Sequence, residues 1–145
     1  MTDVELSKLL TDLEKTAKAL NEASGRVNTI LLSCENKIQS LNLGIEVWLD
    51  DVAIDLSDKS DFEDPSTPNQ IAAASLGFAK VQNIWCLATK ISPDRSRLNN
   101  PIPLLQAPRK VRMGAVELLP RLVRELSVRA EIKLRAIETA EKLVK

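Results

Sequence analysis

The residue types that most often carry chemistry are scarce in this sequence, and histidine is absent. Serine and cysteine nucleophiles usually depend on a histidine base, and most catalytic zinc sites use histidine ligands. The two cysteines, Cys34 and Cys86, are too far apart in the sequence to form a Cys-x-x-Cys pair for zinc or redox chemistry. Both lie in apolar patterns and are interpreted as reduced core thiols. The sequence therefore predicts a protein that is not an enzyme and has no catalytic residue, cofactor or metal site.

Two further kinds of ligand site are disfavoured. The glycines are scattered, which excludes a glycine-rich loop for phosphates or dinucleotides. The acidic segment 55–70 contains carboxylates but lacks the glycine turn of a calcium loop. We interpret it as a solvated loop.

The charges are distributed unevenly along the chain. Overall, 20 basic residues balance 20 acidic ones. Residues 109–135 hold eight basic and three acidic residues, a balance of +5, whereas residues 46–64 hold one basic and eight acidic residues, a balance of −7. Three interpretations stay open: a solvated helix face, pairing of the two patches within or between subunits, or contact with nucleic-acid phosphates. The phosphate contacts would come from Arg109, Lys110, Arg112, Arg121 and Arg124.

A long amphipathic helix is predicted at residues 3–41. Thr2 and Glu5 have the spacing of a capping box. Apolar residues then recur at alternating steps of three and four over about five heptads. Ser24-Gly25 is the weak point, where we expect a kink or a polar gap. A seam of this length needs a partner, in the same chain or in another one.

A second helix is predicted at residues 109–145, after a proline-rich connector at 92–108. Pro120 is expected to bend or split this helix. Its apolar stripe again follows steps of three and four, at Val116, Leu119, Val123, Leu126, Ala130, Ile137, Ala140 and Val144.

Between the helices, residues 45–91 favour a three-stranded antiparallel meander. Ile45, Val47 and Leu49 alternate with Glu46, Trp48 and Asp50, which is the pattern of a strand. Gln82-Asn83 can form a two-residue turn between the next two strands. A helix over 71–91 is the alternative. Trp48 shares a face with two acidic residues, so it either packs beneath a helix or anchors a protein interface.

These elements predict a single α+β domain over residues 1–145. Two long helices, forming an antiparallel coiled-coil-like pair, would flank the small sheet. The predicted function is non-catalytic protein–protein interaction or assembly, through self-association into a homodimer or larger species, or with another protein. A nucleic-acid accessory protein is the alternative. No membrane span is expected, and the predicted location is cytoplasmic. The predicted interface residues are Leu13, Leu20, Val27, Leu31, Trp48, Leu119, Leu126 and Ile137.

Overall fold

The computed structural model describes residues 2–56, 73–92 and 100–144. It has an α+β fold dominated by two helices, as predicted. Most of the acidic loop 55–70 and part of the connector 92–108 lie outside the described residues. In chain order the elements are α1 (Asp3–Ser40), β1 (Val47–Trp48), β2 (Ile54–Asp55), β3 (Ala73–Val81), β4 (Ile84–Ser92), β5 (Ile102–Pro103), the 3-10 helix η1 (Leu104–Gln106) and α2 (Arg109–Val144).

The bounds of both helices follow from local sequence signals. The Thr2 hydroxyl accepts a hydrogen bond from the Glu5 amide at 3.3 Å, and the Glu5 carboxylate accepts one from the Thr2 amide at 3.3 Å. This confirms the predicted capping box. Helix α1 continues through Gly25, and α2 continues through Pro120. Of the two alternatives at Pro120, a bend or a split, the continuous helix excludes the split.

The β3–β4 hairpin confirms the predicted strands over the helical alternative for 71–91. Its nine paired positions run from Ala73↔Ser92 to Val81↔Ile84. The turn residues Gln82 and Asn83 both have positive φ, at 51° and 66°. Two consecutive positive φ values match the right-handed twist of the flanking strands, which is why such turns join hairpins.

The rest of the sheet differs from the predicted three-stranded meander. The expected strand over 45–54 is divided into β1 and β2, and each pairs antiparallel with a different part of β3. The chain bends at Asp51 between them, where two consecutive carboxylates have low strand propensity. A further strand, β5, pairs antiparallel with β4 from within the proline-rich connector. Pro103 is tolerated there because an edge strand need not donate every amide.

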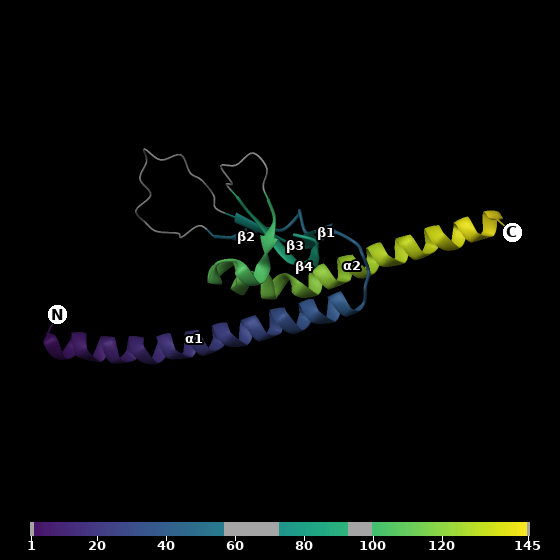
Figure 1. Ribbon diagram of the computed structural model, residues 1–145. Coiled ribbons are helices and arrows are strands. Elements are labelled where there is room, and N and C mark those ends of the chain that lie inside the picture. Colours follow the sequence, from purple (N-terminus) through teal and green to yellow (C-terminus); the bar gives the residue numbers. More distant parts are fainter. Residues whose placement is uncertain (1, 57–72, 93–99, 145) are drawn as a thin grey trace, which may run out of the picture.

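The two helices run parallel, so the predicted antiparallel pairing is wrong (Figure 1). Arg109 contacts Leu20 and Asn21, and Arg112, further along α2, contacts Asn28, further along α1. The apolar stripes give no direction, because a stripe can pair with its partner either way. The direction follows from the strands, which carry the chain back from the end of α1 before α2 begins.

One face of the sheet packs against the helices and forms the main core. The odd-numbered positions Ile45, Val47 and Leu49 are buried, as the predicted alternation requires. The most deeply buried side chains of this core come from α1, β3, β4, η1 and α2, and include Leu31, Leu76, Phe78, Leu87, Leu104, Val111 and Leu122.

Polar side chains of α1 complete the hydrogen bonding of strand β4. The Glu35 carboxylate accepts from the Leu87 amide at 3.0 Å, and the Gln39 side-chain amide donates to the Trp85 carbonyl at 2.6 Å. Strand β5 pairs with β4 at Ala88 and Thr89, beyond these positions. An unpaired backbone group is costly when buried. Helix α1 therefore takes the place of a strand where β5 does not reach.

The opposite face of the sheet is covered by Trp48. A Cβ atom on Gly77 would collide with the Trp48 ring and would lie 2.7 Å from the Val47 carbonyl oxygen. The ring also lies under the Lys90 ammonium, 4.1 Å from its centroid, and its indole N–H donates to Glu46 at 2.9 Å. Glycine at position 77 thus allows the indole to lie directly on the strand.

Two substitutions of Glu35 separate the effect of its charge on stability from the effect of its hydrogen bond to Leu87. Burial raises the pKa of the Glu35 carboxyl, although the Leu87 hydrogen bond acts in the opposite sense. A raised folded-state pKa means that the carboxyl contributes more stability at low pH and loses this contribution as pH rises through the folded pKa. We therefore expect the stability of Glu35→Gln relative to the native chain to increase between about pH 4 and about pH 8. Urea denaturation of both chains measures this difference.

Glu35→Ala is the matched comparison, because it removes the acceptor altogether. Relative to Glu35→Gln it should lower the free energy of unfolding by about 1–3 kcal/mol throughout this pH range, since the Leu87 amide is left buried without a partner and neither variant titrates at position 35. A Gln variant that destabilises as much as the Ala variant, at every pH, would contradict the proposed role of the charge.

A pair of glycine substitutions tests the contact between Trp48 and the sheet. Gly77→Ala should destabilise the fold by about 1–3 kcal/mol, because Trp48 and the Val47 backbone must both move. Gly25→Ala should stabilise it by about 1 kcal/mol, because Gly25 is inside a helix and nothing lies within 4 Å of the added Cβ. Thermal denaturation of the two variants should show shifts of opposite sign.

Candidate interaction surface

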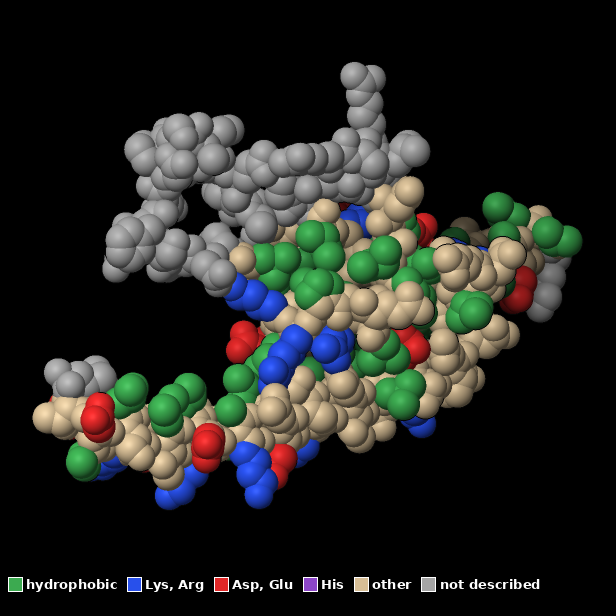
Figure 2. All heavy atoms as spheres, turned by 60° about the vertical axis from the view of Figure 1, so that its left-hand side comes forward, with side chains coloured by type: hydrophobic (Ala, Val, Ile, Leu, Met, Phe, Trp, Pro, Cys, Tyr) green, Lys and Arg blue, Asp and Glu red, His purple; other side chains and the backbone are tan. Residues whose placement is uncertain are grey.

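The N-terminal half of α1 projects beyond the rest of the fold, up to Leu20 and Asn21, which bond to Arg109 of α2. Residues 3–22, here called the α1 overhang, are exposed throughout. At about 1.5 Å per residue the overhang is roughly 30 Å long. Figure 2 shows hydrophobic side chains along one side of this projecting arm. The exposed large apolar residues of the overhang are Val4, Leu6, Leu9, Leu10, Leu13 and Leu20.

The C-terminal half of α2 projects at the opposite end of the molecule (Figure 1). Residues 127–144, here called the α2 overhang, are exposed except for the half-buried Ala130. This overhang is roughly 27 Å long. Its exposed large apolar residues are Val128, Ile132, Leu134, Ile137, Leu143 and Val144. At about 100° per residue, Leu134, Ile137 and Val144 continue the stripe of the buried Leu126, whereas Val128, Ile132 and Leu143 lie on the other side of the helix. Monomeric proteins seldom leave large apolar patches in water, so both overhangs are candidate binding surfaces.

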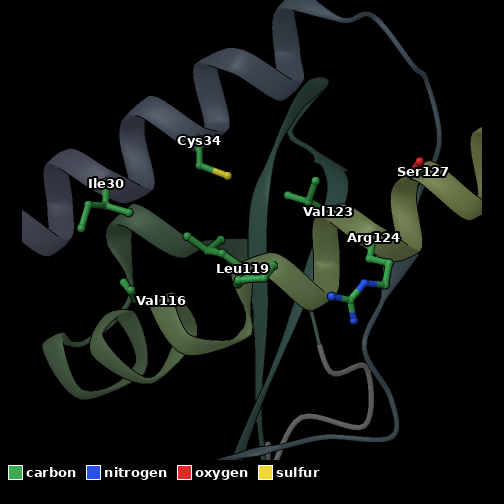
Figure 3. Close-up of a pocket in the computed structure, with 8 residues that line it drawn as sticks. Ile30, Cys34, Val116, Leu119, Val123, Arg124 and Ser127 are labelled. Atoms are coloured by element: carbon green, nitrogen blue, oxygen red, sulfur yellow. The ribbon is translucent and has the colours of Figure 1, made fainter.

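An apolar groove lies between the paired halves of the helices. It has a volume of about 680 Å³. Ile30 and Cys34 line it from α1, and Leu119 and Val123 face them from α2 (Figure 3). Ile30 and Val123 are about half exposed, whereas Leu119 is buried. The groove is therefore the shallow outer surface of the helix pair, and it lies between the two overhangs.

The predicted interface residues fall into two groups. Leu31, Leu119 and Leu126 are buried in the main core, which the helices share with the sheet, and Val27 packs against it, so these residues are not exposed to a partner. The exposed group belongs to the overhangs and consists of Leu13, Leu20 and Ile137. Trp48 is half-buried on the sheet and borders a cavity with Arg121 and Glu125 of α2.

Most of the predicted phosphate contacts have partners within the chain. Arg109 donates to the Leu20 carbonyl at 2.9 Å and to Asn21 at 3.1 Å. Arg112 donates to Asn28 and to the Ala107 carbonyl. The remaining three differ among themselves: Lys110 donates to the Leu56 carbonyl, Arg121 forms an ion pair with Asp51, and Arg124 has no partner in the described part of the chain. These contacts weigh against the nucleic-acid alternative, because the basic side chains mainly connect elements of the fold.

Glu35 acts electrostatically on both cysteines. Burial raises the pKa of the Cys34 and Cys86 thiols, and the Glu35 charge acts in the same direction. A cysteine nucleophile requires a lowered pKa, because the thiolate is the reactive form. Sequence reasoning missed Glu35 because a charged residue beside a heptad seam is normally solvent-exposed.

Comparisons with known proteins give no relative: no family model, curated protein or solved structure matches the chain. Within residues 2–56, 73–92 and 100–144, no helix is long and apolar enough to cross a bilayer. The same part of the chain contains no cluster of three or more His, Cys, Asp or Glu side chains suited to a metal ion. The exposed helical stripes are therefore the most distinctive surface feature of the described structure.

Arginine substitutions test whether the basic residues stabilise the helix pair. Arg112→Ala should lower the free energy of unfolding by about 1.5–3 kcal/mol, because it removes charged hydrogen bonds to Asn28 and Ala107. Arg124→Ala removes the same charge but no such bond, and should change stability by less than about 0.5 kcal/mol. Equal effects in chemical denaturation would show that the Arg112 contacts do not hold α1 against α2.

Proposed function

We propose that this chain is a non-catalytic assembly protein that associates with other copies of itself through the two overhangs. The observation that carries the proposal is the exposure of an apolar stripe on each projecting helix half. In the part of the chain where the helices pair, the same stripes are buried at Leu31, Leu119 and Leu126. The overhangs thus have the side chains of a helix interface but lack the second helix.

The size of the hydrophobic effect supports an association of this kind. Full burial of a large aliphatic side chain contributes about 1.5–3 kcal/mol, so a half-exposed one can contribute about 1 kcal/mol when it is covered. Of the twelve large apolar side chains exposed on the overhangs, eight lie on the stripes that continue the buried seams: Leu6, Leu9, Leu10, Leu13, Leu20, Leu134, Ile137 and Val144. Their combined contribution lies within the roughly 4–15 kcal/mol that association costs in lost freedom of motion.

Helix stability gives a second reason for a partner. An isolated helix of about 12–15 residues or fewer is marginal in water, and most helices in proteins depend on packing of an apolar face. The overhangs are somewhat longer, at 20 and 18 residues, but their apolar faces have no packing partner in the described chain. A bound copy would supply this packing. The proposal includes a cytoplasmic location, where the two free thiols would remain reduced.

Size-exclusion chromatography with light scattering tests the proposal. The native chain should have a mass of more than one chain at both ~0.1 M and ~0.5 M salt, because apolar burial is little affected by screening. Replacing Leu13 and Ile137 by Glu should give a monomer that keeps its core fold, since both side chains lie outside the core, while the uncovered overhangs fray and lower the helical circular dichroism.

The matched control places glutamates away from the stripes, as Thr11→Glu with Thr139→Glu. Both residues are exposed and contact only their own helix. This variant should keep the mass of the native chain. A native chain that is monomeric at micromolar concentration in both salts would overturn the proposed self-association.

A further inference from the structure

The parallel direction of the helices places the two overhangs at opposite ends of the molecule (Figure 1). Helix α2 begins beside Leu20 and Asn21, where Arg109 bonds to α1. Helix α1 ends at Ser40, while α2 continues to Val144. Each overhang is therefore half of a parallel helix pair whose other half is missing. The α1 overhang has no α2 helix beside it, and the α2 overhang has no α1 helix beside it.

The stripes on the overhangs continue those that pair within the chain. On α1, the buried Leu31 belongs to the same heptad seam as Leu10 and Leu13. On α2, the buried Leu126 is followed on its stripe by Ala130 and Ile137. A copy displaced along the helix axis would place its α1 overhang beside the α2 overhang of the first molecule, and this contact would have the direction of the pairing inside each chain.

We propose that copies of this chain join head to tail, with the α1 overhang of one copy lying parallel to the α2 overhang of the next. This inference rests on the proposed self-association and specifies its geometry. The two overhangs have similar lengths, roughly 30 Å and 27 Å, so one can cover the other along nearly its whole extent. The contact between chains repeats the α1–α2 contact within the chain.

The charges of the overhangs favour this arrangement over a two-fold dimer. The α1 overhang has five acidic residues and three lysines, a balance of −2. The α2 overhang has four basic and three acidic residues, a balance of +1. A two-fold dimer that pairs each overhang with its own equivalent would bring like net charges together. A two-fold dimer that pairs α1 overhangs with α2 overhangs would hold them antiparallel, unlike the pairing within the chain. The head-to-tail contact brings opposite charges together, which selects the partner and its orientation more than it adds affinity.

A head-to-tail contact is heterologous, so it uses two different surfaces of each copy. A growing assembly then has one unused α1 overhang at one end and one unused α2 overhang at the other. If all copies carry substitutions on the same overhang, no contact between them can form. Two molecules damaged at different overhangs should still be able to form one contact with each other.

This property gives a test with two complementary variants. The first carries Leu10→Glu and Leu13→Glu on the α1 overhang, and the second carries Leu134→Glu and Ile137→Glu on the α2 overhang. All four side chains are exposed, so both variants should keep the core fold. Light scattering should show each variant alone as a monomer, and an equimolar mixture as a species with the mass of two chains. The control with Thr11→Glu and Thr139→Glu should assemble as the native chain does.

The outcomes separate this inference from the proposed function. If the native chain assembles but stops at the mass of two chains, or if either variant alone forms a dimer, the contact is two-fold, and the head-to-tail inference is overturned while self-association stands. A mixture that stays monomeric, with a native chain that assembles, also overturns it. A native chain that is monomeric overturns both proposals.

Discussion

The hydrogen bonds from Arg109 to the Leu20 carbonyl and to Asn21 set the axial position of α2 against α1, and the shape of the molecule depends on this position. Because α2 begins beside the middle of α1, the first half of α1 has no helix next to it. Because α1 ends at Ser40, the second half of α2 has none either. A parallel pair also requires the chain to return along the helices before α2 starts. The sheet provides this return path and covers the paired halves of both helices.

The sheet in turn depends on α1 for its completion. Glu35 and Gln39 bond to backbone groups of β4 that β5 does not reach. The burial that raises the pKa of Glu35 also excludes water from this edge. Helix α1 therefore has two roles in one continuous element: its second half belongs to the core, and its first half is available for binding. Changes in the core should leave the binding surface chemically unchanged, and the reverse also holds.

Local features of the fold were predictable from sequence, whereas relations between distant elements were not. The capping box at Thr2 and Glu5, the bounds of the helices and the Gln82-Asn83 turn each depend on a few neighbouring residues. The helix direction was wrong because an apolar stripe pairs equally well both ways. Strand β5 was missed because prolines at 101 and 103 favour a connector, and only tertiary context makes them an edge strand. Within the candidate surface, Leu13, Leu20 and Ile137 could be found from periodicity, but their separation from the buried Leu31, Leu119 and Leu126 depends on the axial offset of the helices.

The central claim is that both overhangs are covered by other copies of the chain. Amide hydrogen exchange, followed by peptide mass spectrometry, tests it most directly, because protection reports whether a helix is packed or frayed. In the native assembly, residues 3–22 and 127–144 should exchange slowly, and they should exchange fast in the monomeric variant with Glu at positions 13 and 137. The core segments around Leu31 and Leu122 should be equally protected in both proteins. Fast exchange of the overhangs in the native protein, together with a protected core, would contradict the claim.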